Sequence, residues 1–198
     1  MTAPALTPLV SCGLAALRAA AAAAGLTLTS SASWPETDAD VKVTALAGFV
    51  ESNFSPLLAE VAGRALGRRD QPQSPTAVTA VTAVVMVTAR NDVTSATRVA
   101  AAVDAGERVL PLLFFQSVPN SVAGYLAARW RLTGPVVCVS GIRAGLDVAA
   151  LLIEDADADE ALVVCVDLAV NGGDVDRAAA IVVTDHPGFR SSASRRLP

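Results

Sequence analysis

Apolar residues along the chain follow two spacings, one typical of helices and one typical of buried strands. Between residues 49 and 68, apolar side chains recur every three or four positions with charges between them, which predicts an amphipathic helix. Residues 77–89, AVTAVTAVVMVTA, form an almost unbroken run of β-branched and small apolar residues, as expected of a strand that is buried on both faces. Segments of these two kinds alternate along the chain.

The positions of the other helices and strands are predicted from glycines that end helices, from capping residues and from apolar runs. Further helices are predicted at residues 13–25, 91–106, 117–132 and 144–155, and further strands at residues 26–34, 135–140, 160–169 and 177–185. The first of these strands becomes serine-rich, which is typical of a sheet edge. The alternation predicts an α/β domain with a largely parallel sheet covered on both faces. We expect one domain over residues 1–185 and a disordered tail over residues 186–198.

Composition and charge narrow the possible functions. The chain is 53% hydrophobic but only 4% aromatic, so its core must consist mostly of Ala, Val and Leu. A net charge of −4, with arginines clustered only in pairs, argues against nucleic-acid binding. Cys12, Cys138 and Cys165 have no framework spacing, and we expect reduced, buried cysteines in a cytoplasmic protein. The alanine-rich run at residues 14–24 is too short to cross a membrane, and LVSCG around Cys12 lacks the preceding regions of a signal peptide.

The common cofactor and catalytic motifs are missing from the sequence. It contains neither a P-loop nor a GxGxxG fingerprint. His186 is the one histidine and cannot form a metal site by itself. The acidic run DADADE at residues 155–160 is interpreted as a solvated turn between a helix and a strand. We therefore expect no metal and no other cofactor.

A more specific pattern lies in residues 110–141, LPLLFFQSVPNSVAGYLAARWRLTGPVVCVSG. Its informative positions are Phe114, Ser117, Pro119, Asn120, Ala123, Gly124, Gly134 and Pro135. In this order and spacing they resemble the β-ketoacyl synthases of the thiolase fold. There a phenylalanine-containing loop leads into an S-x-P-N-x-x-A-G helix, a GP turn and the strand that delivers the nucleophilic cysteine. The resemblance is good over residues 110–185 and looser before them. It implies a thiolase-like half, from αβαβα-type layers, with a mostly parallel buried sheet covered by Ala-rich helices.

The same resemblance implies that the catalytic groups are missing. The position of the family's nucleophilic cysteine falls on Arg143, whose guanidinium stays protonated and cannot act as a nucleophile. Cys138 lies five residues earlier, inside the predicted strand, and is interpreted as a packed thiol. Ser140 has no identifiable base, and His186 is interpreted as a surface-loop residue. The family's two catalytic histidines belong to a C-terminal half that we do not find in this sequence.

The leading hypothesis is a non-catalytic ketosynthase-like subunit, similar to the chain-length factor of type II polyketide systems. Such a subunit dimerises with a catalytic ketosynthase and helps to shape its acyl tunnel in polyketide- or fatty-acid-type biosynthesis. The residues expected at the interface or tunnel are Phe114, Phe115, Asn120, Val137, Cys138, Val139 and Arg143. For the two phenylalanines, burial in the core is the favoured alternative to lining the tunnel.

Two other functions stay open at this point. The chain could be an enzyme in its own right that processes acyl thioesters with Ser140, Cys138 or His186 as the working group. It could also be a homodimeric acyl-binding or regulatory module. Arg143 either pairs with a partner's carboxylate or an acyl carrier protein's phosphate, or points to solvent.

Overall fold

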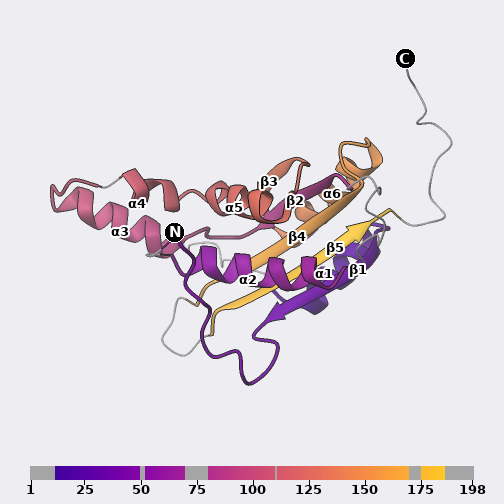
Figure 1. Ribbon diagram of the computed structural model, residues 1–198, viewed down its shortest axis with the longest axis horizontal. Helices are drawn as coiled ribbons and strands as arrows, with labels where there is room; N and C mark the ends of the chain where they lie inside the picture. Colours follow the sequence, from indigo (N-terminus) through magenta and orange to yellow (C-terminus); the bar gives the residue numbers. More distant parts are fainter. Residues whose placement is uncertain (1–11, 50–51, 70–79, 110, 170–174, 186–198) are drawn as a thin grey trace, which may run out of the picture.

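One five-stranded sheet organises the chain (Figure 1). The computed structural model describes residues 12–49, 52–69, 80–109, 111–169 and 175–185. The strand order is β1-β5-β4-β2-β3, where the strands are β1 (Thr27–Trp34), β2 (Thr82–Val87), β3 (Val136–Val139), β4 (Glu160–Asp167) and β5 (Arg177–Thr184). β2 pairs in parallel with β3 and β4, whereas β5 runs antiparallel to β4 and β1. Four strands thus point the same way, and β5 is the exception to the predicted parallel sheet.

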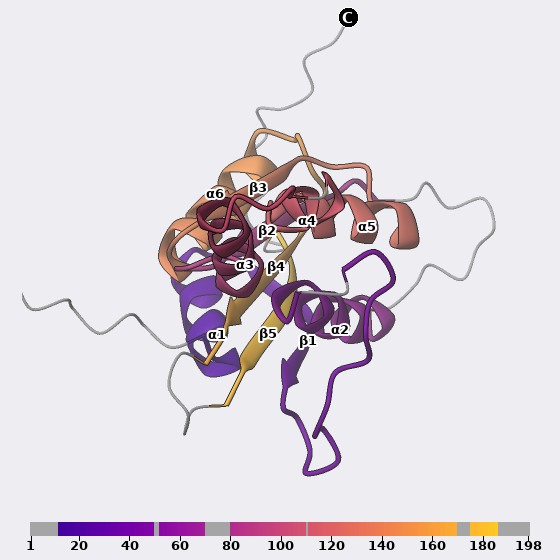
Figure 2. The ribbon, with the colours of Figure 1, turned by 90° about the vertical axis from the view of Figure 1, so that its left-hand side faces the viewer.

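Helices cover both faces of this sheet (Figure 2). One face carries α1 (Leu14–Ala23) and α6 (Ile142–Glu154). The other carries α2 (Phe54–Gly67) and α5 (Asn120–Trp130). Two further helices, α3 (Val93–Asp104) and α4 (Pro111–Gln116), project beyond the carboxyl ends of the parallel strands (Figure 1). We call α3 and α4 together the helical arm.

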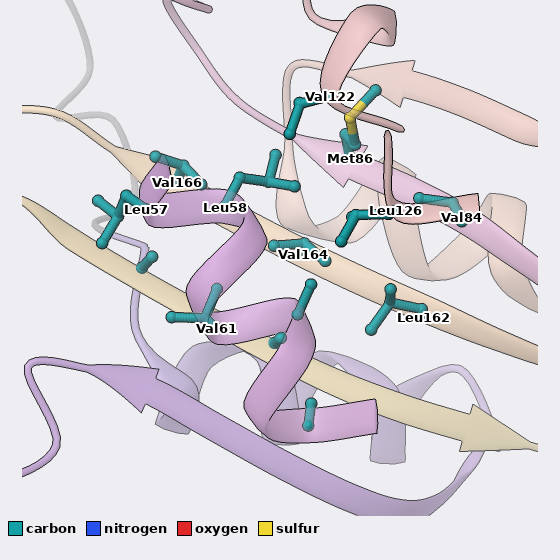
Figure 3. Packing of buried hydrophobic residues seen from close by; sticks show 14 of the residues in the cluster. Leu57, Leu58, Val61, Val84, Met86, Val122, Leu126, Leu162, Val164 and Val166 are labelled. Carbon is teal, nitrogen blue, oxygen red and sulfur yellow. The ribbon is translucent and has the colours of Figure 1, made fainter. Parts of the chain in front are cut away.

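The core consists of two apolar layers, one on each face of the sheet. Successive strand side chains point to opposite faces, so Val84 and Met86 of β2 pack toward α2 and α5, while Val85 packs toward α1 and α6. Figure 3 shows Val61 of α2 and Leu126 of α5 within the first of these layers. Every residue of β2 is buried, which confirms the interpretation of its unbroken apolar run.

Most predicted elements begin or end within a few residues of the observed ones, and two segments differ in an informative way. The helix predicted at residues 49–68 begins only at Phe54, where the Ser52 hydroxyl accepts a hydrogen bond from the Ser55 N–H at 2.8 Å. The phenylalanine-containing segment is helical, as α4, rather than a loop. The predicted tail at residues 186–198 lies outside the described residues, and the single-domain boundary stays a prediction.

The expectation of three reduced, buried cysteines is wrong in two respects. Cys12, just before α1, and Cys165 of β4 form a disulfide, with their Cα atoms 5.7 Å apart, within the range that a disulfide spans. Cys138 is free but exposed, because it lies on the edge strand β3. The cytoplasmic location stays a prediction.

Gly134 allows β3 to lie against β2. Its N–H donates to the Thr82 carbonyl at 3.1 Å, and a Cβ atom at this position would lie 2.6 Å from the Thr82 carbonyl carbon. Because the obstacle is backbone, a side-chain rotation cannot relieve it. The GP turn of the sequence is therefore needed for the close approach of two strands.

We predict that Gly134→Ala lowers the free energy of unfolding by about 1–3 kcal/mol, the usual cost of overpacking. Gly124→Ala in α5 is the matched control, because a Cβ there meets no atom within 4 Å. The control should stabilise the protein by up to about 1 kcal/mol, since alanine favours helices over glycine. Urea unfolding of both variants measures the difference, and equal stabilities would contradict the close approach.

Candidate functional site

The outer side of β3 presents unused backbone hydrogen-bonding groups. On its inner side, the Val84 N–H donates to the Pro135 carbonyl at 2.8 Å, and the Thr88 N–H donates to the Val139 carbonyl at 3.0 Å. Residues of a strand alternate in the side to which their N–H and C=O groups point, so those of Val136 and Cys138 point outward. Among the described residues, no strand pairs with this outer side. β3 is an open edge.

The opposite edge of the sheet is protected in ways that β3 is not. At β1, the Arg68 guanidinium donates to the Ser31 carbonyl at 2.9 Å, and the pairing register shifts between Leu28 and Ser30. Charged side chains and bulges of this kind prevent pairing between sheet edges. β3 has the uncharged sequence VVCV and a regular register with β2. The two edges therefore differ in their readiness to accept another strand.

The helical arm adds exposed apolar side chains near this end of the sheet. Phe114 and Phe115 of α4 are 62% and 54% exposed, and Leu112 and Val118 are also exposed. The expectation that the two phenylalanines are buried is wrong: among the described elements α4 packs mainly against α3 and α5, and both rings stay exposed. Large apolar side chains grouped on a surface mark a site of interaction with another molecule.

Arg143 lies in the first turn of α6, at the position where the ketosynthase resemblance places the nucleophile. Its side chain is 82% exposed, and its nearest ion-pair partner is Asp147 on the same helix at 3.5 Å. A cation is unfavourable near the positive end of a helix, where a thiolate would be stabilised. The position that the resemblance assigns to the nucleophile thus carries a guanidinium, which cannot attack a thioester.

The alternative nucleophiles lack an activating neighbour in the described part of the chain. The Cys138 thiol lies 3.9 Å from the amide oxygen of Asn91, and partial desolvation raises its pKa. Ser140 is exposed directly after β3, and His186 lies outside the described residues. Cys138 thus stays a neutral thiol at neutral pH, which is the opposite of an activated nucleophile.

The other predicted interface residues lie around the edge strand or next to the arm. Val137 and Val139 are half-buried in β3, and Val139 packs against the layer below α1 and α6. Asn120 is exposed at the first position of α5. Sequence reasoning missed Val136, because only the pairing with β2 reveals which residues direct their backbone groups outward.

The described residues contain neither a candidate metal site nor a candidate membrane-spanning helix. No group of three or more His, Cys, Asp or Glu side chains in the described ranges could hold a metal ion. No helix within those ranges is long and apolar enough to cross a membrane.

Solved structures of ketosynthases and chain length factors resemble this chain. A chain from the complex of the ketosynthase ApeO with its chain length factor ApeC from Xenorhabdus doucetiae has a TM-score of 0.62 at 20% identity, over 82% of this chain and 79% of that one. A chain from the ishigamide ketosynthase/chain length factor has a TM-score of 0.57 at 19% identity, over 83% of this chain and 51% of that one.

A β-ketoacyl synthase from Burkholderia phymatum STM815 has a TM-score of 0.55 at 15% identity, over 87% of this chain and 54% of that one. No family model matches the sequence, and no curated protein matches it. This chain has the thiolase-like fold of ketosynthases and chain length factors, so the predicted resemblance is confirmed for the fold. It spans about half the length of the second and third of these structures.

We predict that iodoacetamide alkylates Cys138 with a half-maximal rate above about pH 8.5, the ordinary pKa of a cysteine thiol. The thiolate is the reacting form, and desolvation raises the pKa of Cys138, so its thiolate forms at higher pH than that of an unperturbed cysteine. Intact mass measured against pH gives the profile, with Cys138→Ala as the background. A midpoint below about pH 7.5, as in activated thiols, would contradict this prediction and favour the acyl-thioester enzyme.

Proposed function

We propose that the chain is a non-catalytic ketosynthase-like subunit that pairs through β3 with a catalytic ketosynthase. The open edge of β3 is the observation that carries this proposal. A strand from a partner would satisfy the outward groups of Val136 and Cys138 and join two sheets into one. Because β3 is uncharged, this pairing requires no charge to be buried.

The symmetry of such a pairing fixes the strand direction. Two subunits of the same fold, related by a twofold axis between equivalent edge strands, place those strands antiparallel. Antiparallel pairing of β3 exchanges hydrogen bonds through the outward residues and leaves the parallel ladder with β2 intact. Two of the similar structures contain a ketosynthase together with a chain length factor, and this supports a ketosynthase as the partner.

The non-catalytic role rests on the first turn of α6. Arg143 occupies the position that the resemblance assigns to the nucleophile, and a guanidinium cannot attack a thioester. The raised pKa of Cys138 gives little support to the alternative of a stand-alone acyl-thioester enzyme. We therefore assign the condensation chemistry to the partner.

The helical arm is the part of the chain that we assign to the partner's acyl tunnel. It lies beyond the carboxyl ends of the parallel strands, which is where α/β sheets generally bind ligands (Figure 1). Phe114 and Phe115 expose their rings there. Covered by a partner, these rings would form an apolar wall suited to an alkyl chain. Contact with an acyl carrier protein stays a prediction without a specific site.

We predict that Cys138→Pro abolishes co-purification with the catalytic ketosynthase, because proline removes an N–H that points outward from the edge. The N–H of Cys138 takes no part in the ladder with β2, so the variant should stay folded. Co-expression with ketosynthases encoded beside the gene, followed by affinity purification, makes the measurement.

Cys138→Ala is the matched control, because it removes the thiol and keeps the N–H. It should retain the complex at wild-type yield. Thermal melting of both variants verifies that they are folded. A folded Cys138→Pro variant that still captures the ketosynthase would contradict pairing through β3.

We predict that Phe115→Ala leaves the complex intact and lengthens the acyl product, because it opens the proposed apolar wall. Val103→Ala is the control, since Val103 is an exposed apolar residue of the same arm, on α3. Mass spectrometry of the products of the reconstituted complex gives the chain length. An unchanged product from Phe115→Ala would show that this ring does not limit the tunnel.

A further inference from the structure

Two arginines from opposite helical layers meet at one residue of the edge strand β1. Arg18 of α1 donates to the Ser31 hydroxyl at 2.9 Å, and Arg68, directly after α2, donates to the Ser31 carbonyl at 2.9 Å. Because α1 and α2 cover different faces of the sheet, the two side chains reach this edge from both faces. Ser31 lies near the middle of β1. A further strand beside β1 would therefore meet a guanidinium group from each face of the sheet.

Glu36, two residues after β1, holds Arg68 in this position. Its carboxylate accepts two hydrogen bonds from the Arg68 guanidinium, both at 2.7 Å. These bonds are the main reason why the pKa of Glu36 lies below its usual value, so the carboxylate is ionised at neutral pH. A bidentate pair fixes the orientation of a guanidinium as well as its position. Arg68 is thus anchored over the edge of β1 and does not move freely in solvent.

Without these arginines, the two edges of the sheet would fit each other. β1 and β3 run in the same direction at opposite edges of one sheet (Figure 1). A β3 strand from a second copy can therefore add beside β1 as a parallel strand, and the same step can repeat at the next copy. Head-to-tail contacts of this kind do not close and produce filaments. Within the described part of the chain, β3 is the open, uncharged strand edge that a bare β1 would attract.

We propose that Arg18, Arg68 and Glu36 form a guard on β1 that keeps β3 of a second copy from adding there. The guard leaves β3 as the edge at which the sheet can be extended, and it prevents the chain from polymerising through its own sheet. Charged side chains on edge strands are a general means of preventing such pairing. The proposal rests on the open edge of β3 and does not require a ketosynthase as the partner.

Removal of both arginines tests this guard. In sedimentation velocity, the purified wild-type chain should contain species no larger than a dimer. The double variant R18A/R68A should shift to larger sedimentation coefficients that increase with protein concentration. Both side chains are exposed and their contacts are individually weak, so the variant should stay folded, which thermal melting verifies. Glu36→Gln should give a smaller shift in the same direction, because Arg68 loses its anchor but keeps its charge.

Two control variants separate the guard from a general effect of charge or stability. The variant R129A/R143A removes two exposed arginines of other elements, α5 and α6, with the same change in net charge. It should sediment like the wild type. The variant R18A/R68K restores a positive charge at the edge, and lysine is a residue that protects edge strands. It should also sediment like the wild type, and failure of this rescue would contradict a guard based on charge.

Cys138→Pro identifies the strand that adds to β1. Head-to-tail addition needs the outward N–H of Cys138, so the triple variant R18A/R68A/C138P should lose the larger species. Larger species that persist in the folded triple variant would show that β3 is not the added strand, which overturns the proposal. A folded R18A/R68A variant that sediments like the wild type, or a wild-type chain that itself forms filaments, would also overturn it. Capture of the ketosynthase by R18A/R68A, measured separately, reports on the proposed function alone.

Discussion

A strand at the edge of a sheet keeps half of its backbone N–H and C=O groups without a partner, and β3 is such a strand. The rest of the chain holds it in that position. Gly134 brings it against β2, where the hydrogen bonds from Val84 and Thr88 fix its register. The outward direction of the groups of Val136 and Cys138 follows from that register. The proposed function depends on these outward-pointing backbone groups, because a partner strand would have to bond to them.

Several other features of the molecule are consistent with a partner strand at the unpaired edge of β3. The opposite edge, at β1, is closed by an arginine contact and a register shift, so the molecule offers strand pairing on one side. The arm places Phe114 and Phe115 beyond the strand ends, where a partner across β3 would cover them. Arg143 lies in the same region, at the position that the resemblance assigns to the nucleophile. The unpaired edge of β3, together with a guanidinium at the position that the resemblance assigns to the nucleophile, favours a supporting subunit over an enzyme.

The sequence predicted the fold well because its signals are local. The unbroken apolar run of β2 and the helical spacing of α2 depend on neighbours along the chain, and both were confirmed. The misinterpreted residues depend on contacts between distant segments. The disulfide joins Cys12 to Cys165, 153 positions further along the chain, and the exposure of Phe114 requires α4 to lie away from the sheet. The strand order, which makes β3 an edge, is likewise invisible in a single sequence.

The backbone amides of β3 give the most direct measurement of the proposed pairing. Hydrogen–deuterium exchange, resolved to single residues, reports whether the N–H groups of Val136 and Cys138 are hydrogen-bonded. Adding the catalytic ketosynthase should slow exchange at these two amides strongly, while the amide of Val139, already paired with β2, changes less. If a complex forms and both outward amides exchange as fast as in the free chain, the ketosynthase does not pair with β3.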